Sequence, residues 1–464
     1  MGEPKQRKTA SRNYEIDMCS GPLMSKIILF AVPLMASGVL QLLFNAADII
    51  VVGRFAGSES MAAVGSTSAL INLIVNVFIG LSIGANVLVA RFYGSRSARD
   101  LEETVHTSIL IAAVGGVILI FVGVLLAAPM LELMGTPDDV LPLAVLYMRI
   151  YFAGMPATLL YNFGSAILRA VGDTRRPLYY LLTAGIVNVF LNLFFVIVFH
   201  MDVAGVALAT VISQCISAML IIRCLMQSDA AYRLNLKRVR IVKDKLISIA
   251  KIGLPAGFQG AIFSISNVLI QSSVNSFGSV AMAGNTASSN IEGFVYTSMN
   301  AVYQTALSIT SQNYGAKNYK RMTRVLLYCL ALVTAVGVIM GDGAVLIGPQ
   351  LLSIYSSEAE VIQYGMNRLR ICSGLYFFCG LMDVMVGGLR GMGYSVIPMV
   401  VSLTGACAFR IVWIYTVFAM DRQLVTLYWS YPASWLLTFL VHLATYLFIR
   451  HMEAQGKAHR IKIH

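Results

Sequence analysis

The feature that most constrains the fold is a series of long apolar runs without charged residues. Ile109–Met130 and Leu178–Phe199 each extend for 22 residues without Asp, Glu, Lys or Arg. A helix of about 20 such residues spans the hydrocarbon core of a bilayer. Charged residues make up only 12% of the chain, about half of the usual share in a soluble domain. The chain is therefore predicted to be a polytopic membrane protein.

The apolar runs and the breaks between them predict an all-α fold of twelve transmembrane helices. The predicted spans are residues 24–52, 58–90, 101–130, 140–169, 176–199, 203–226, 246–277, 281–313, 322–347, 358–390, 395–418 and 424–450. Residues 227–245 form the longest polar connection, so they are predicted to link an N-terminal bundle (24–226) to a C-terminal bundle (246–450). Residues 1–23 and 451–464 are predicted to be tails.

The distribution of basic residues predicts the orientation. Most of the 34 Lys and Arg residues lie on one side of the predicted spans. They occur in the N-terminal segment through Lys26, in 91–99, 169–176, 223–251 and 317–324, at Arg390, and after Phe448. Cytoplasmic loops are enriched in Lys and Arg. Both termini and the linker are therefore predicted to lie in the cytoplasm, and the protein in the cell (inner) membrane, with an uncleaved first span.

The two halves repeat each other. LRAVGDTRRP (168–177) and LRGMGYSVIP (389–398) share Leu, Arg, Gly and Pro at a spacing of 221 residues. At the same spacing, RFYGSRS (91–97) aligns with QNYGAKN (312–318). Each half has an even number of spans, so both enter the membrane from one side. Two parallel six-helix repeats with a cavity between them are expected.

A single carboxylate, Asp48, interrupts the first apolar run, Phe30–Gly57. Asp48 lies six residues before Arg54, which is roughly 9 Å along a helix. An ionisable residue at such a depth is costly, and by default it marks a functional site. The alternative is that Asp48 faces water or pairs with a structural neighbour.

Three polar residues on later spans lie at a similar depth. Counting from the outer ends of their spans places Asn192 and Thr210 roughly 9 to 12 Å deep. Asn188 lies one turn from Asn192 on the same helix face. With Asp48 they form a set of hard oxygen ligands that bears one negative charge, as expected for a coupling H⁺ or Na⁺. Alternatively, the Asn and Thr side chains only form hydrogen bonds between helices.

The second half carries a different set of polar residues. Glu292 and Arg410 both lie near mid-membrane, so an ion pair between them is predicted. Asp383 and His442 lie at similar depths from the cytoplasmic end, so they are expected to be neighbours. These four residues are candidates for a substrate-binding or charge network, and structural ion pairs are the alternative.

Backbone features suggest places for bending and close packing. Pro33 and Pro255 lie inside the first span of each half and are candidate hinges, because proline kinks a helix. The Gly80–Gly84 pair has the GxxxG spacing that permits close approach of two membrane helices.

Motif searches argue against an enzyme. The sequence has no GxxxxGK[ST], HExxH or GxSxG motif, and its histidines and cysteines do not cluster at metal-ligand spacing. The net charge of +12 is spread over short loops, which argues against binding to nucleic acid. The expected partners are the bilayer and small organic molecules, the expected oligomeric state is a monomer, and no cofactor is expected.

Several motifs together resemble the multidrug and toxic compound extrusion family. They are FNAADIIVVGRFAG (44–57), AAVGSTSALINLI (62–74), ARFYGSRSARDLEE (90–103), GVALATVISQ (205–214), ITSQNYGAKNYKRM (309–322) and the paired LRxxGxxxxP sequences. The similarity covers about residues 25–450. It implies a secondary antiporter in which two six-helix bundles rock to export organic compounds, commonly cationic ones, in exchange for H⁺ or Na⁺.

The resemblance also assigns residues. Asp48 matches the family's first-span acid, and Asn188 and Thr210 match polar partners of the N-terminal cation site in one branch. Asn192 stands where that branch often has a second Asp, which leaves Asp48 as the only carboxylate. Another branch has a Glu in the seventh span, but residues 256–267 contain no acid, and Asp383 matches that branch's acid only loosely. A C-terminal sodium site is therefore not expected.

Two other functions remain open from the sequence. A lipid-linked saccharide flippase of the same superfamily would have a broad basic cavity, and the sequence shows no strong excess of arginines for one. A membrane-embedded transferase would need acids or histidines clustered in a loop at the membrane surface, and the sequence shows none.

Overall fold

The computed structural model describes residues 14–455 and is α-helical throughout, with no strand in that range. The N-terminal half comprises α1 (Leu23–Phe55), α2 (Ser58–Gly94), α3 (Ala98–Leu133), α4 (Leu141–Ala153), α5 (Met155–Ala170), α6 (Arg175–Leu193), η1 (Phe194–Val198) and α7 (Asp202–Met226). Residues 1–13 and 456–464, which hold much of the two predicted tails, lie outside the described residues.

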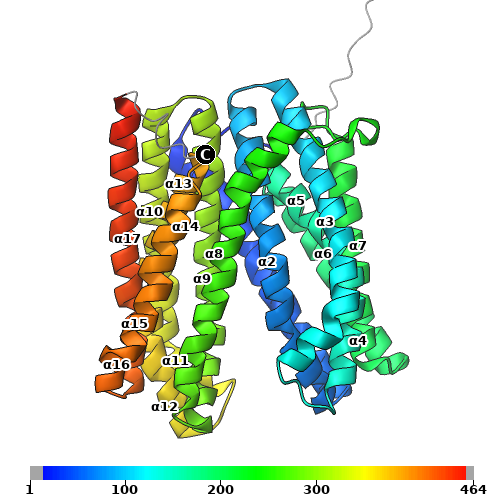
Figure 1. Ribbon diagram of the computed structural model, residues 1–464, viewed down its shortest axis with the longest axis vertical. Helices are drawn as coiled ribbons and strands as arrows, with labels where there is room; N and C mark the ends of the chain where they lie inside the picture. The colour runs from blue at the N-terminus through cyan, green and yellow to red at the C-terminus, as the bar shows by residue number, and fades with distance from the viewer. Residues whose placement is uncertain (1–13, 456–464) are drawn as a thin grey trace, which may run out of the picture.

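The C-terminal half follows a linker that contains only the short η2 (Leu236–Arg238). It comprises α8 (Lys243–Asn275), α9 (Ser279–Gly315), α10 (Tyr319–Leu346), α11 (Gly348–Ser353), α12 (Ala359–Arg368), η3 (Leu369–Ser373), α13 (Phe377–Gly391), α14 (Val396–Ser402), η4 (Leu403–Ala408), α15 (Phe409–Tyr415), α16 (Val417–Met420) and α17 (Leu424–Ala454). Figure 1 shows the two halves side by side, with their long helices roughly parallel.

The structure contains the twelve predicted spans, which are of three kinds. Within the described residues, nine helices are long and apolar enough to cross a membrane. Two bent pairs add one span each: α4 with α5, bent by 49°, and α12 and η3 with α13, bent by 42°. The twelfth span is α9, which is as long as its counterpart α2 but rich in Ser, Asn, Thr and Gln. Its polar residues explain why hydropathy alone does not detect it.

Backbone conformation repeats at the spacing found in the sequence. Gly57 and Gly278, which precede α2 and α9, both have φ near +90° (91° and 94°), and Gly172 and Gly393 have φ of 96° and 99°. Such values favour glycine because it has no Cβ. Both pairs are separated by 221 residues, so the repeat includes the loops as well as the helices.

Apolar side chains cover the outside of the bundle. Leu125 on α3, Phe190 on α6 and Ile339 on α10 are 68%, 71% and 73% exposed. Such exposure is unfavourable in water, but it suits helices whose outer faces meet lipid tails. Pro33 and Pro255 each lie within one uninterrupted helix, α1 and α8.

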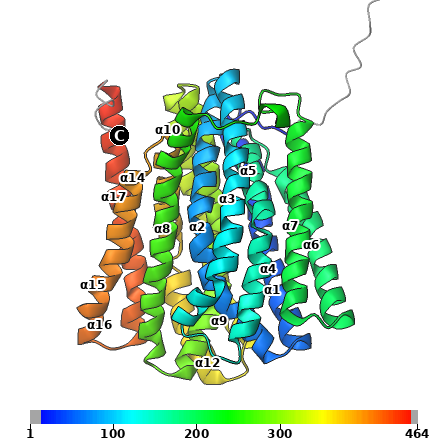
Figure 2. The same cartoon turned by 45° about the vertical axis from the view of Figure 1, so that its right-hand side comes forward.

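The halves meet most closely along α2 and α8, which lie side by side in both views (Figures 1 and 2). Gly80 and Gly84 face the backbone of α8. A Cβ atom on Gly80 would come within 2.3 Å of the Gly257 nitrogen, and one on Gly84 within 2.3 Å of the Ile249 oxygen. The predicted role of this GxxxG pair in close packing is confirmed.

Further contacts between the halves lie toward one end of the molecule, here called the linker end, which holds the loops 95–97, 171–174, 227–242, 316–318 and 392–395. Ser308 on α9 donates a hydrogen bond to Asn86 on α2 (3.0 Å), and Gln312 donates one to the carbonyl of Ala170 (2.5 Å). In Figure 1 this end is at the top, and α2 and α9 diverge toward the opposite end.

Candidate functional site

Four polar residues of the N-terminal half form one hydrogen-bonded group, here called the amino-terminal polar cluster: Asp48, Asn188, Asn192 and Thr210. The Asn192 amide donates to Asp48 Oδ1 and to Asn188 Oδ1 (3.2 Å), and the Asn188 amide donates to Thr210 Oγ1 (3.5 Å). These residues come from α1, α6 and α7. The structure thus brings together the residues that counting along the spans placed at one depth.

The cluster contains an oxygen that lacks a partner. Asn192 is fully buried, and its Oδ1 atom has no hydrogen bond among the described residues. A buried acceptor without a donor is unfavourable, but a small cation beside Asp48 would satisfy it. The donor set of a carboxylate, amide oxygens and a hydroxyl fits H⁺ or Na⁺. Within the described chain, no group of three or more His, Cys, Asp and Glu is arranged to hold a metal ion.

Two tyrosines that the sequence did not indicate lie within electrostatic range of Asp48. They are Tyr147 and Tyr151 of α4, whose rings stack at 6.0 Å. Helix α4 forms the first part of a bent span, so counting residues along a straight helix could not place its side chains.

The predicted pair of Glu292 with Arg410 is wrong. Glu292 instead accepts from Arg368, whose Nη2 and Nε lie 2.8 to 3.2 Å from the carboxylate oxygens. Arg368 also donates to Asn285 Oδ1 (2.6 Å), and both charged residues are buried. Arg368 is the last residue of α12, just before the π-helical turn η3. That irregular turn lies within the bent span, and it changes which residues face inward.

Arg410 occupies a different environment. Its Nε donates to Ser434 Oγ (2.9 Å), and its guanidinium lies 4.5 Å from the Tyr431 ring and 5.7 Å from the Trp435 ring. Arg410 is buried, yet it forms no ion pair with a carboxylate of the described residues.

The expected contact between Asp383 and His442 is also replaced. His442 is buried, and its Nε2 atom forms a hydrogen bond with Ser402 Oγ (3.0 Å) at the end of α14. Asp383 on α13 lines the central cavity and has no hydrogen bond among the described residues. The two residues are at similar depths, but α17 turns His442 toward α14.

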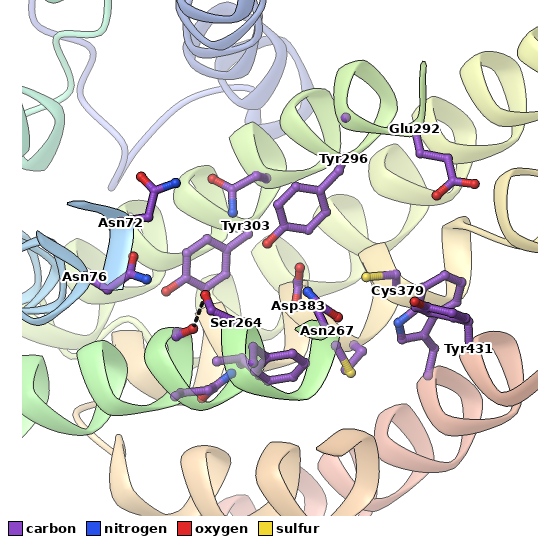
Figure 3. A pocket seen from close by; sticks show the side chains of 18 of the residues that line it. Asn72, Asn76, Ser264, Asn267, Glu292, Tyr296, Tyr303, Cys379, Asp383 and Tyr431 are labelled. Atoms are coloured by element: carbon purple, nitrogen blue, oxygen red, sulfur yellow. Dashed lines mark hydrogen bonds between the residues drawn. The ribbon is translucent and has the colours of Figure 1, made fainter. Parts of the chain in front are cut away.

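A cavity of about 710 Å³ lies where the two halves meet. Its walls come from the middle of α2 and from α8, α9, α12, α13, α15 and α17 (Figure 3). Polar lining residues include Asn72, Asn76, Gln259, Asn267, Asn300 and Tyr303. Of the predicted network, Glu292, Asp383 and Arg410 line the cavity, whereas His442 does not.

Two of the arginines that line this cavity, Arg368 and Arg390, were not predicted as site residues. Arg390 was counted as a basic residue at the cytoplasmic boundary. In the structure it is buried and donates to Tyr303 OH (3.0 Å) and Gln259 Oε1 (2.7 Å). The repeated LRG sequence predicted where Arg390 lies along its span, but not that its side chain points into the cavity.

Two parallel six-helix bundles around a central cavity, with a buried polar cluster in the N-terminal bundle, are the arrangement expected of a membrane transporter. Comparison with known proteins identifies which kind. The family model MatE matches residues 33–194 and 255–416, one segment in each half. The chain belongs to this family, which confirms the resemblance seen in the sequence and makes the protein a transporter rather than an enzyme.

Relatives and solved structures agree with this assignment. The chain is 26% identical over 432 residues to the "Probable multidrug resistance protein YoeA" of Bacillus subtilis, covering 91% of this chain and 93% of that protein. It is 24% identical to an "FAD transporter" of Shewanella oneidensis, covering 83% and 86%. The structure entitled "Outward-facing conformation of a multidrug resistance MATE family transporter of the MOP superfamily" matches with a TM-score of 0.88 at 21% identity, covering 94% and 98%.

Proposed function

We propose that this protein is a monomeric antiporter that exports small organic compounds in exchange for H⁺ or Na⁺. The relatives include multidrug resistance proteins and an FAD transporter, which supports organic cargo. A cavity of about 710 Å³ is in the usual range for a drug-sized ligand. Both termini lie in the cytoplasm, and the cavity opens alternately to the two sides of the inner membrane.

The amino-terminal polar cluster is the observation that best supports coupling of export to a cation. Asp48 is tied to Asn192, and the Asn192 Oδ1 atom is buried without a partner. Burial favours the neutral acid, whereas a bound Na⁺ favours the carboxylate. Asp48 therefore alternates between a cation-loaded and an empty state during transport. A ligand shifts a conformational equilibrium only through a difference in affinity for the two conformations, and cation binding supplies that difference.

The arrangement of the halves supports alternating access. Close contacts of α2 with α8, and those of Asn86 and Gln312, lie toward the linker end. Opening the cavity to the cytoplasm requires breaking these contacts and forming new ones at the opposite end. Pro33 in α1 and Pro255 in α8 remain the candidate hinges for that movement.

The flippase alternative is less well supported. The cavity has three arginines and two carboxylates, so its excess positive charge is small. Much of one wall is aromatic, which suits flat organic compounds better than a saccharide headgroup.

The test is uphill efflux by purified protein in liposomes, driven by an imposed pH or Na⁺ gradient. Asp48→Asn keeps the size and hydrogen bonding of the side chain but removes the charge, so concentrative efflux is expected to be lost while the protein still folds. Asp202→Asn is the matched control, because Asp202 is exposed at the start of α7. Asn192→Asp is expected to keep transport with a changed dependence on pH or Na⁺. Wild-type efflux by Asp48→Asn would refute the coupling role.

A further inference from the structure

The Arg410 guanidinium lines the central cavity without an acidic partner. Arg410 is 3% exposed, and its Nε is held by Ser434. Its two Nη groups have no hydrogen-bond partner among the residues that the structure describes. The two Nη atoms are open to the cavity rather than fully buried, and a charged donor in such a confined place favours an acceptor. The free donors of Arg410 therefore indicate a place for an acceptor that the protein itself does not supply.

The charges around the cavity do not balance. Its ionisable lining residues, apart from tyrosines and a cysteine, are Arg368, Arg390, Arg410, Glu292 and Asp383, which leaves one positive charge in excess. Glu292 is fully engaged by Arg368. Asp383 lies two turns before Arg390 on α13, so the two are on one helix face. Arg390 uses its terminal donors on Tyr303 and Gln259, so Arg410 is the arginine of this lining whose terminal donors are free.

An aromatic row leads to this arginine along one cavity wall. Ring centroids are 6.3 Å apart for Tyr296 and Tyr376, 5.0 Å for Tyr376 and Trp435, and 5.7 Å for Trp435 and Tyr431. Arg410 lies over the last two rings at 5.7 and 4.5 Å. Figure 3 shows Tyr296 and Tyr431 among the lining side chains, with Cys379 near Tyr431. These cation–π contacts fix the guanidinium and leave its terminal donors for a ligand.

We propose that the cavity binds planar aromatic compounds that carry an oxyanion, a carboxylate or a phosphate, with the oxyanion on Arg410. The two Nη groups suit a charge-assisted, bidentate contact with such a group, and the aromatic row suits the ring. This inference rests on the proposed function and names its substrate class. A cationic compound would meet the unpaired guanidinium and could be balanced only by Asp383.

The experiment measures binding to purified wild-type protein by equilibrium dialysis, with three probes that share one ring system. They are 2-naphthoate, 2-naphthyl phosphate and (2-naphthylmethyl)ammonium. At least one anion is expected to bind roughly tenfold or more tightly than the cation. The relative affinity of the two anions distinguishes a carboxylate site from a phosphate site. Equal or tighter binding of the cation would overturn the proposal.

Substitutions test whether the anion binds at Arg410. Arg410→Gln is expected to weaken binding of the favoured anion by roughly tenfold to a hundredfold without weakening the cation, and Arg410→Lys to weaken it less. Arg422→Gln, at an exposed loop position, is the matched control and should change nothing. Unchanged anion binding by folded Arg410→Gln would contradict the proposal.

Two further arms keep the test decisive. If Arg410→Gln does not fold, the comparison of the three probes on wild-type protein still tests the preference for an anion. Asp383→Asn should also tighten anion binding, because it raises the excess positive charge of the cavity. Weaker anion binding by Asp383→Asn would count against the proposal. The binding comparison uses the wild-type protein without an ion gradient, so its outcome is independent of whether uphill efflux is driven by H⁺ or Na⁺. This separates failure of the substrate assignment from failure of the proposed antiport.

Discussion

At the scale of single residues, Glu292 and Arg368 form a buried ion pair in the C-terminal half. Arg368 donates to both carboxylate oxygens of Glu292 and to Asn285, and Tyr428 donates to the same Asn285 oxygen (3.3 Å). Removing one partner of a buried pair leaves a charge without compensation, which typically costs about 3–5 kcal/mol, whereas removing both costs less.

We therefore expect Glu292→Gln alone or Arg368→Gln alone to lower thermal stability more than the double variant does. Arg370→Gln is the matched control, because Arg370 lies two residues away and is exposed. Thermal unfolding of the purified proteins measures the effect. Additive losses in the double variant would show that the two residues do not stabilise each other.

The polar cluster of the N-terminal half was predicted correctly, whereas the buried ion pair of the C-terminal half was not. Counting along α1 and α7 placed Asp48 and Thr210 correctly, because rise and periodicity are regular there. The partner of Glu292 was predicted wrongly, because η3 and the 42° bend alter the direction of side chains near the end of α12. Tertiary contacts fix that bend, and no local sequence pattern reports it.

At the scale of elements, residues 14–22, here called the N-terminal strap, connect the two halves at the linker end. Glu15 accepts hydrogen bonds from Tyr93 (2.9 Å) and Tyr232 of the N-terminal half and linker. The backbone oxygen of Met18 accepts from Arg321 on α10 (3.0 Å). Within the strap, Ser20 donates to the carboxylate of Asp17, which holds the pKa of Asp17 below its usual value. The contribution of this contact is therefore present at neutral pH and is lost as the pH falls below the usual pKa of an aspartate.

Arg321 is the main anchor of the strap to the C-terminal half, because it also donates to the backbone oxygens of Ser20 (2.7 Å) and Gly21 (3.0 Å). Arg321→Gln should loosen the strap and weaken closure at the linker end. Faster amide hydrogen exchange in residues 14–22 is the expected result. Lys320→Gln, at the exposed neighbouring position, should leave exchange unchanged. Equal exchange in both variants and wild type would show that the strap does not depend on Arg321.

At the scale of the whole molecule, the orientation in the membrane can be tested directly. Lys237 in η2 and Glu358 before α12 are both exposed and lie at opposite ends of the protein. In the background variant, Ser replaces Cys19 and Cys215, the two native cysteines that are not buried. A cysteine introduced at position 358 should then react with an impermeant maleimide in intact cells. A cysteine at 237 should react only after the cells are opened. Labelling of 237 from outside would reverse the orientation.

The repeat explains why the overall architecture was predictable although individual contacts were not. Paired loop sequences defined two equivalent halves, and the equal φ values of Gly57 and Gly278 show the same repeat in the backbone. The cavity lining was not predictable, because it depends on how the halves meet. Arg390 illustrates this limit: its boundary position was clear, but its contacts with Tyr303 and Gln259 depend on three helices.

In the proposed mechanism, cation occupancy of the amino-terminal polar cluster controls which end of the molecule is open. This control is tested most directly by spin-label distances between Glu59→Cys on α2 and Glu360→Cys on α12, both exposed near the end opposite the linker. The measurement is made in nanodiscs at several pH values and Na⁺ concentrations. We predict a shift of the distance distribution with cation concentration in the wild-type background and no shift with Asp48→Asn. An equal shift in both backgrounds would contradict the account.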